Sequence, residues 1–393
     1  MALNQTEKEA IGVEVTAELS KTTYACTSLT VLSGGTANFI FRGTLVMPLP
    51  DGSQSIIIKH LKEYVAANRN FKLDVSRSVC FSIPSTLDFE EMMLNVMDSF
   101  PAVITDNFSV RTPHLQYSNC NTNTHILEDL VGTMDMKTML VTDTKYDVLT
   151  QPMCIAIGRA LGHWLRGFHN WTSAPGQVDL RDYMSGNKAM REVRYGISYG
   201  AFIDVVRKFP EIWEENREVL ERVKNMAAAE YANTNLQETE ESWTIVHGDF
   251  WSGNVLTPDP TTFQNQQSEG GNVFVIDWEL AQYGRKEYDL GQMIGDLYER
   301  KHFEGLGSAL WILQAFVSGY GVLSDKMAFR TAIHAGVHLI CWYIRRDPNA
   351  PFTEAPEQIQ DAIRIGTDFI VKGWMRDLTW FEGSPLACLF KHG

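Results

Sequence analysis

Two short apolar stretches in the second half of the chain each run directly into an aspartate motif. Residues 244–246 lead into a His-Gly-Asp sequence that ends at Asp249, and residues 273–276 lead into Asp277. Short apolar runs bounded by polar residues are typical of buried strands. Burying a carboxylate at the end of such a strand is costly unless a partner or a metal ion balances its charge. The pattern therefore predicts two strands that present acidic side chains at their ends.

The chain divides into a strand-rich first third and a helical remainder. A chain of 393 residues is larger than one hydrophobic core normally supports, so two lobes are expected. The predicted fold class is α+β and bilobal, with a β-rich N-lobe over residues 1–130 and a mainly helical C-lobe over residues 131–393. Periodicity and turn residues predict strands at 28–32, 37–47, 55–59 and 125–130, and helices near 86–98 and 151–171.

Composition limits the partners and the compartment. The contents of 44% hydrophobic and 21% charged residues are those of a globular protein. A formal net charge of −14 argues against a nucleic-acid partner, which would require clustered Lys and Arg. The six cysteines are scattered without a Cys-x-x-Cys pair, which disfavours a zinc site. Residues 1–19 do not resemble a signal peptide and no stretch is typical of a membrane span, so we expect a cytoplasmic protein with no membrane partner. The oligomeric state is left open.

The segment from His247 to Asn254 carries the residue types that phosphoryl transfer needs. The reaction requires a carboxylate that orients and deprotonates the attacking hydroxyl, and an oxygen ligand for a metal ion that neutralises the phosphates. Asp249 as catalytic base and Asn254 as metal ligand supply both from one loop after a strand. His247 is expected to hold the loop through hydrogen bonds. A surface loop that contains these residue types by chance is the alternative.

The second strand-end acid favours the metal interpretation. Asp277 follows the apolar run 273–276, as does the aspartate with which kinases hold Mg²⁺. Glu279 is a candidate further ligand, directly or through water. The alternative is that Asp277 only caps its strand, and the order of the two motifs along the chain makes that interpretation the weaker one.

A glycine turn upstream fits a nucleotide site. Ser33, Gly34 and Gly35 join two predicted strands, and glycines at that point would allow backbone N–H groups to approach phosphate oxygens. Because Gly-Gly turns occur in many hairpins, the turn gains meaning only from the motifs that follow it.

A lysine at the end of the next apolar strand completes the set. Lys59 ends the run 55–59, like the nucleotide-binding lysine of kinases, and needs an acidic partner. Glu90 on the following predicted helix is the favoured partner and Glu91 the fallback, because the two acids cannot face the same direction on a helix. Pro84 breaks any helix in the segment between Lys59 and Glu90.

These motifs, in this order, resemble the aminoglycoside phosphotransferase/choline kinase family over about residues 32–297. Within that family, the segments 249–254 and 277–284 look particularly like the methylthioribose kinase-related branch, which includes the fungal hydroxytryptamine kinase. The resemblance is carried by His247-Gly248-Asp249 with Asn254, Ile276-Asp277-Trp278-Glu279, Tyr288-Asp289-Leu290-Gly291 and Gly162-x-x-Leu165-x-Gly167-Phe168-His169.

The resemblance implies a protein-kinase-like fold with ATP in the cleft between two lobes, Mg²⁺ as its metal, and phosphorylation of a hydroxyl on a small molecule. It implies that Lys59 contacts the nucleotide phosphates and that Asp249 is the base. The backbone near Glu128 and Leu130 would meet the adenine, and Asp289 would brace the catalytic loop.

The substrate is not named by the sequence. Trp251, beside the base, is expected to face it, and a cationic amine on the substrate could pair with Asp296 or Glu299. Three interpretations remain: a small-molecule kinase, a kinase-fold enzyme that uses ATP to activate a substrate for another transformation, and a nucleotide-binding pseudokinase. The intact set of Asp249, Asn254 and Asp277 speaks against the third.

Overall fold

The computed structural model describes residues 5–32, 38–62, 64–65, 68–72, 86–146, 149–232, 242–260, 270–346 and 350–390. Contacts divide the chain into two compact units. Unit 1 comprises Met1–Ser99 and Thr112–Val131, and unit 2 comprises Phe100–Arg111 and Gly132–Gly393. Residues 100–111, which the sequence assigned to the N-lobe, therefore belong with the helical remainder of the chain.

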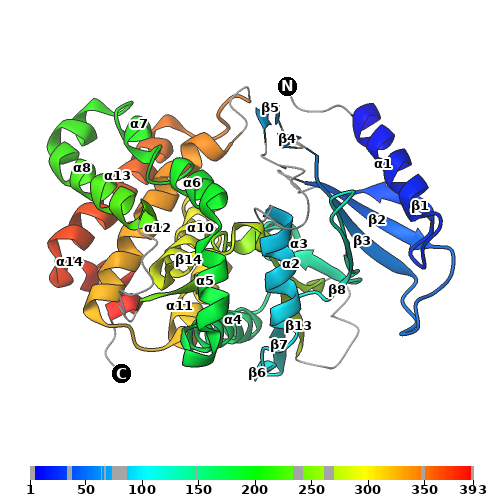
Figure 1. Ribbon diagram of the computed structural model, residues 1–393. Coiled ribbons are helices and arrows are strands. Elements are labelled where there is room, and N and C mark those ends of the chain that lie inside the picture. Colours follow the sequence, from blue (N-terminus) through cyan, green and yellow to red (C-terminus); the bar gives the residue numbers. More distant parts are fainter. Residues whose placement is uncertain are drawn as a thin grey trace. The chain divides into compact units, whose positions relative to one another are not determined.

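Unit 1 is built on a five-stranded sheet (Figure 1). Each strand pairs antiparallel with its neighbours. In spatial order the strands are β1 (Cys26–Val31), β2 (Phe39–Leu45), β3 (Ser55–His60), β9 (Thr124–Glu128) and β8 (Leu115–Asn119). The four strands predicted in this region are present as β1, β2, β3 and β9. The unit also contains α2 (Thr86–Met97), which confirms the predicted helix, and the short ribbon β4 (Tyr64–Val65) and β5 (Asn68–Lys72).

Helix α1 (Gln5–Leu19) covers one face of this sheet (Figure 1). Ile11, Val15 and Leu19, spaced four residues apart, point to one side of the helix and pack with Phe41 and Ile58 of the sheet. This helix is not evident from the sequence, because charged residues interrupt its apolar pattern.

Unit 2 contains a mixed five-stranded sheet and a two-stranded one. The larger sheet has the order β10 (Thr133–Asp135), β12 (Val255–Pro258), β13 (Gly271–Val275), β7 (Phe108–Arg111) and β6 (Val103–Thr105). Because β7 pairs parallel with β13, residues 100–111 are tied to unit 2. In the smaller sheet β11 (Trp243–Val246) pairs antiparallel with β14 (Gln282–Arg285). The strands predicted at 244–246 and 273–276 are thus present as β11 and β13.

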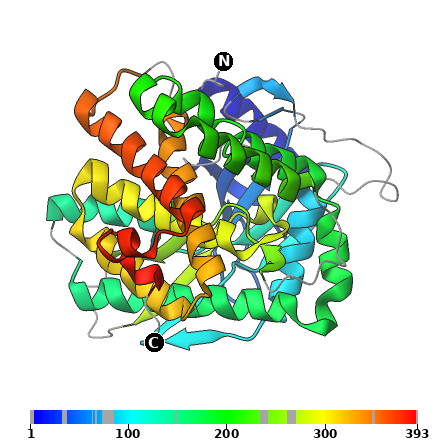
Figure 2. The same ribbon diagram turned by 90° about the vertical axis from the view of Figure 1, so that its left-hand side faces the viewer.

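The helices of unit 2 make up most of its mass (Figure 2). Helix α10 is buried along most of its length and packs against α11, α12 and α13. The helices are α3 (Met136–Tyr146), α4 (Gln151–Ser173), α5 (Val178–Ser185), α6 (Lys188–Gly196), α7 (Phe202–Val206), α8 (Pro210–Ala232), α10 (Lys286–Glu304), α11 (Gly307–Tyr320), α12 (Asp325–Arg345), α13 (Pro356–Met375) and α14 (Leu378–Glu382). No helix in the described ranges is long and apolar enough to cross a membrane.

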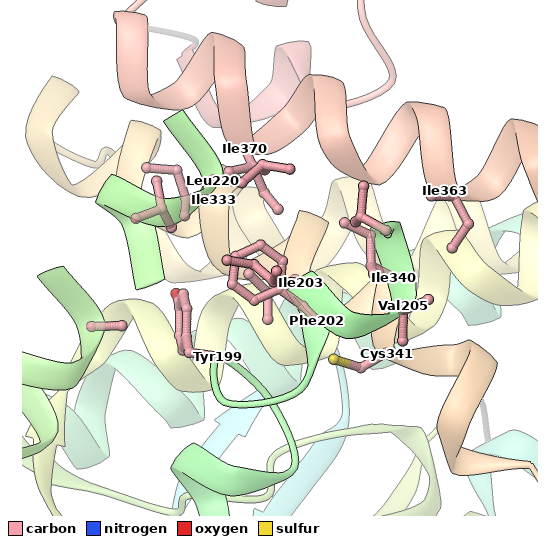
Figure 3. Close-up of a cluster of buried hydrophobic side chains, with 14 of the residues drawn as sticks. Tyr199, Phe202, Ile203, Val205, Leu220, Ile333, Ile340, Cys341, Ile363 and Ile370 are labelled. Atoms are coloured by element: carbon pink, nitrogen blue, oxygen red, sulfur yellow. The ribbon is translucent and has the colours of Figure 1, made fainter. Parts of the chain in front are cut away.

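One hydrophobic cluster joins four of these helices. Phe202 and Val205 of α7 pack with Leu220 of α8, Ile340 of α12 and Ile363 of α13 (Figure 3). All of these side chains are buried, so the cluster fixes the outer helices of unit 2 by removal of apolar surface from water.

Helices α4 and α11 approach each other closely at glycines. A Cβ atom added at Gly162 would lie 2.1 Å from the carbonyl oxygen of Phe316 and 2.5 Å from the backbone nitrogen of Tyr320. Any larger residue must therefore push the two backbones apart.

We predict that Gly162→Ala lowers the free energy of unfolding by roughly 1–3 kcal/mol, because the added methyl group overpacks this contact. Gly167→Ala on the same helix is the matched control, since its Cβ would lie 3.4 Å from Phe100, an ordinary contact. That control should be neutral or stabilising, as alanine has the higher helix propensity. Urea unfolding of both variants checks the prediction, and equal stability of the two would contradict it.

Candidate active site

The loop between β11 and β12 is held by Asp289 from the first turn of α10. The Oδ2 atom of Asp289 accepts from the backbone N–H of His247 at 2.8 Å, and Oδ1 accepts from that of Gly248 at 3.0 Å. Asp289 is fully buried, and His169 of α4 donates from Nε2 to Oδ2 at 3.1 Å. Three donors therefore balance the buried charge. The geometry is that of the brace expected from the sequence.

Gly248 supplies a conformation that other residues would resist. Its φ is +80°, and a Cβ atom there would lie 2.2 Å from the carbonyl oxygen of Leu280. Glycine is the residue that adopts this region without steric cost and allows so close a backbone approach.

His247 is engaged through both ring nitrogens. Its Nε2 lies 2.9 Å from the carbonyl oxygen of Ile276, and its Nδ1 lies 3.2 Å from the backbone nitrogen of Asp249. Because a carbonyl only accepts, Nε2 carries the hydrogen and Nδ1 accepts from the Asp249 N–H. The ring thus links the loop to the end of β13, and neither nitrogen is left for a reacting group.

The carboxylate of Asp249 is fixed by three donors. Oδ2 accepts from Asn254 Nδ2 at 3.0 Å and from Trp251 Nε1 at 3.2 Å. Oδ1 accepts from Gln292 Nε2 at 2.6 Å. Asp249 is half-buried. These bonds set the carboxylate in one rotamer, which a base that must meet a hydroxyl in a defined direction requires.

Trp251 was expected to face a substrate, and its indole N–H is directed at Asp249. A Cβ atom at Gly253 would lie 2.5 Å from the indole ring, so the glycine makes room for the ring over the loop. The ammonium group of Lys137 lies 5.6 Å from the ring centroid. Trp251 therefore orients the carboxylate, whatever else its half-exposed ring contacts.

Gln292 and Arg194 were missed by the sequence analysis. Gln292 donates to Asp249, and its Oε1 accepts from Arg194 Nη2 of α6 at 2.6 Å. Both side chains are buried. The signal was the spacing of polar residues among apolar ones on α10: Asp289, Gln292 and Asp296 recur at i, i+3 and i+7, which is one helix face.

Asp296 was predicted to pair with an amine of the substrate, but its carboxylate is buried and bonded to the protein. It is 1% exposed, and its Oδ2 accepts from the backbone N–H of Ser252 at 3.2 Å. Its Oδ1 accepts from Arg300 at 3.4 Å. Glu299, the alternative acid, is also buried and forms an ion pair with Arg345. Both carboxylates are committed to groups of the protein.

Asn254 and Asp277 are brought together by a backbone bond. The Ile276 N–H donates to the carbonyl oxygen of Asn254 at 3.0 Å. Asp277, the next residue, therefore lies beside the loop. Asp277 has φ +67° and ψ +68°, a left-handed conformation that costs about 1–2 kcal/mol in a non-glycine residue. Such strain is common at functional positions. Glu279 follows in the 3-10 turn Trp278–Leu280.

The donor set of this pair fits a hard divalent cation. Asn254 Nδ2 donates to the backbone oxygen of Asp249 at 3.0 Å and to its carboxylate, which leaves the amide oxygen of Asn254 for a metal ion. Carboxylate and amide oxygens are ligands that Mg²⁺ accepts while it keeps waters or phosphate oxygens. Within the described ranges, no group of three or more His, Cys, Asp or Glu residues is placed to hold a metal ion.

In unit 1, Lys59 pairs with Glu90. The Nζ atom lies 2.8 Å from Oε1 of Glu90, and both side chains are buried. Glu91 instead accepts from Ser118 Oγ at 2.7 Å. The favoured pairing is confirmed, and the fallback is not the one formed. Ser33, Gly34, Gly35 and Pro84 lie outside the described residues.

The segment predicted to meet adenine already uses one of its donors. The Glu128 N–H donates to the carbonyl oxygen of His114 at 3.0 Å, and the Glu128 side chain accepts from the His114 N–H at 3.2 Å. Leu130 is buried. The adenine contact stays a prediction. It would have to use backbone groups of this segment other than the Glu128 N–H.

The chain is similar to known phosphotransferases. The model of the phosphotransferase enzyme family matches residues 141–323. A phosphotransferase, FrzJ, of Cladobotryum sp. is 32% identical over 382 residues, which cover 96% of this chain and 95% of that protein. The 4-hydroxytryptamine kinase of Psilocybe cyanescens is 26% identical over 318 residues, 79% of each chain.

A solved structure shares the fold. The structure of amicoumacin kinase hAmiN in complex with AMP-PNP, Ca²⁺ and Ami matches with a TM-score of 0.50 and 12% sequence identity, over 94% of this chain and 96% of that one. The predicted α+β, kinase-like fold class is confirmed.

Unit 1 contains two histidines whose protonation should change the free energy of unfolding with pH. Burial lowers the pKa of His60 and of His125 to about 4, and the charges of Lys62 and Lys59 respectively act in the same direction. Between pH 6.5 and pH 4 the unfolded chain therefore binds more protons than the folded one, so stability falls as the pH falls.

We predict that each of the two histidines costs about 2 kcal/mol of stability between pH 6.5 and pH 5. Urea unfolding at both pH values measures the difference, and His125→Gln should reduce it, whereas His163→Gln at an exposed position of unit 2 should leave it unchanged. An unaltered pH dependence in His125→Gln would contradict the prediction.

Proposed function

Because this chain belongs to the phosphotransferase enzyme family, we propose that it transfers the γ-phosphate of ATP to a hydroxyl group of a small molecule. One observation carries the proposal: Asp249 is held by Asn254, and Asn254 is bonded through its carbonyl oxygen to the residue before Asp277. A base and two oxygen ligands for a metal ion are thereby joined in one rigid element. Phosphoryl transfer requires these groups to be positioned together.

In the proposed reaction, the substrate hydroxyl oxygen attacks the γ-phosphorus of ATP. The bond between the γ-phosphorus and the β–γ bridging oxygen breaks, ADP leaves with that oxygen, and the hydroxyl proton passes to Asp249. Gln292 and Trp251 keep the carboxylate aimed while it accepts the proton. The hydroxyl thus becomes a phosphate monoester.

The remaining residues act on the nucleotide. We assign Asn254 and Asp277 as ligands of Mg²⁺, with Glu279 as a ligand directly or through water, and Lys59 as a contact of the ATP phosphates. The bound ion would neutralise charge on the phosphates as the bond breaks. Glu90 holds the Lys59 ammonium group in place by the 2.8 Å ion pair.

For the acceptor, we propose a small hydroxyl compound that also bears an amine. The support is the name of a relative, 4-hydroxytryptamine kinase, which combines these two groups in its substrate. Asp296 is not assigned to the amine, because its oxygens bond Ser252 and Arg300.

The test incubates the full chain with Mg²⁺-ATP and a panel of amino alcohols, hydroxyindole amines, phenols and sugars, and follows ADP and phosphorylated product by mass spectrometry. On the compound turned over fastest, Asp249→Asn should lower kcat by roughly 10²–10⁴-fold, because the amide cannot accept the proton. Asp204→Asn, at an exposed position of α7, is the matched control and should keep full activity. Activity that survives in Asp249→Asn would exclude the assigned base, and phosphate release without a phosphorylated product would favour substrate activation for another reaction.

A second variant separates orientation of the base from its chemistry. Gln292→Met keeps the side-chain volume and removes the 2.6 Å bond to Asp249, so kcat should fall roughly 10- to 100-fold, the value of a hydrogen bond to a charged group. KM for ATP should not change, since Gln292 is not assigned to the nucleotide. Gln358→Met, which breaks bonds to the carbonyl oxygens of His302 and Phe303, controls for loss of a half-buried, hydrogen-bonded amide. A change in KM alone would show that Gln292 serves binding instead.

A further inference from the structure

The side-chain amide of Gln292 has two possible orientations, and only one of them serves Asp249. Its Nε2 donates to Oδ1 of Asp249 at 2.6 Å, and its Oε1 accepts from Nη2 of Arg194 at 2.6 Å. A half-turn of the amide would exchange its oxygen and nitrogen and set the oxygen against the carboxylate. Two acceptors in contact repel each other, and the carboxylate would lose a charge-assisted hydrogen bond. The arrangement of Asp249 therefore depends on what fixes this amide.

Arg194 fixes the amide because a guanidinium group only donates hydrogen bonds. After a half-turn, the amide N–H groups would face the N–H groups of Arg194, so Gln292 would lose both of its bonds together. Without Arg194, Oε1 would have to stay without a donor or turn away from Asp249 to find one. Arg194 is 6% exposed and Gln292 is 3% exposed, so water has little access as a substitute.

The helix that carries Arg194, α6, is held at both of its ends. At the start, Asn187 is 1% exposed and donates from Nδ2 to the carbonyl oxygen of Ala281 at 2.9 Å. At the other end, Ser198 Oγ donates to the carbonyl oxygen of Arg194 at 2.6 Å, and Tyr195 packs against the hydrophobic cluster of α7, α8, α12 and α13. The guanidinium group therefore extends from a fixed backbone.

The positive charge of Arg194 is not balanced by an ion pair. Within the described ranges, neither Arg194 nor Arg191 on the same helix pairs with a carboxylate, and Nε of Arg194 has no hydrogen-bond partner. On the side of α12, burial and the charges of Arg194 and Arg330 hold the pKa of His334 well below its ordinary value, so this neighbour is neutral. A buried charge without a partner is costly for stability. Such local costs are expected at functional positions.

We propose that Arg194 is a positioning residue of the phosphotransfer reaction. It fixes the Gln292 amide with Nε2 toward Asp249, and it thereby keeps the carboxylate directed at the acceptor hydroxyl. The bond from a cation also polarises the amide, which makes its N–H a stronger donor to Asp249. This inference rests on the proposed function, in which Asp249 is the base.

The first part of the test compares two buried arginines of α6 on the acceptor that is turned over fastest. Arg194→Met should lower kcat roughly 5- to 50-fold, because a buried amide oxygen loses its donor, and should leave KM for ATP unchanged. Arg194→Lys keeps a side chain that only donates, so it should recover most of the lost kcat. Arg191→Met is the matched control and should keep the wild-type kcat. Arg191 is 4% exposed and likewise donates one hydrogen bond, to the carbonyl oxygen of Ser185 at 2.8 Å.

The second part is a double-mutant cycle with Gln292→Met. In that background Arg194→Met should change kcat by less than about twofold, because Arg194 acts only through the amide. Losses that multiply in the double variant would overturn the inference. Urea unfolding of the single variants gives a separate readout: Arg194→Met should be as stable as Arg191→Met, and a much lower stability would show that Arg194 serves the fold instead.

Asp249→Asn in the same assay separates this inference from the proposed function. Full activity of Arg194→Met beside an inactive Asp249→Asn would overturn the role of Arg194 and leave the proposed function standing. Activity that survives in Asp249→Asn would overturn the proposed base and, with it, the role of Arg194 in the reaction.

Discussion

The shape of the loop from His247 to Asn254 depends on a polar face of one buried helix. Asp289, Gln292 and Asp296 follow one another along α10, and each bonds a different point of the loop: the N–H groups at its start, the carboxylate of Asp249, and the N–H of Ser252. Because α10 is buried along this length, these polar groups must find partners inside the protein. The polar side chains of α10 and the loop groups satisfy each other's hydrogen bonds. The helix therefore sets the shape of the loop.

This mutual satisfaction explains how strained backbone is tolerated there. Asp277 is left-handed, and Gly248 has a positive φ beneath the carbonyl of Leu280. Unfavourable conformations persist only where surrounding bonds over-determine them. His247 provides two such bonds, to Ile276 and Asp249, and Asp289 provides two more. One of these bonds reaches Ile276, the residue before Asp277, and the other three fix the loop beside it.

The sequence was sufficient for elements that depend on local pattern. Strands at Ser55–His60 and Trp243–Val246 follow from apolar runs, and the pairing of Lys59 with Glu90 follows from burial of a lysine that requires an acid. The sequence was insufficient where the hydrogen-bonding or packing partner of a residue is remote along the chain. Gln292 and Asp296 have the spacing of a helix face, yet nothing local says whether that face meets water, a substrate or a loop. Residues 100–111 joined unit 2 for the same reason, since the parallel pairing of β7 with β13 is a non-local contact.

Charge near Asp249 limits how a substrate can approach it. Asp296 and Glu299 are engaged by arginines, and burial raises the pKa of Glu299 to about 7, so neither offers a ready anion to an amine. On the side of Gln292 the charge is positive: Arg194 is buried, and its Nε has no hydrogen-bond partner among the described residues. An ammonium group would be repelled from that side. If the acceptor bears an amine, the amine is expected to point away from α6 and away from the Trp251 ring, because the Lys137 ammonium group already lies 5.6 Å from the centroid of that ring. These charges therefore limit the direction in which an amine on the substrate could point.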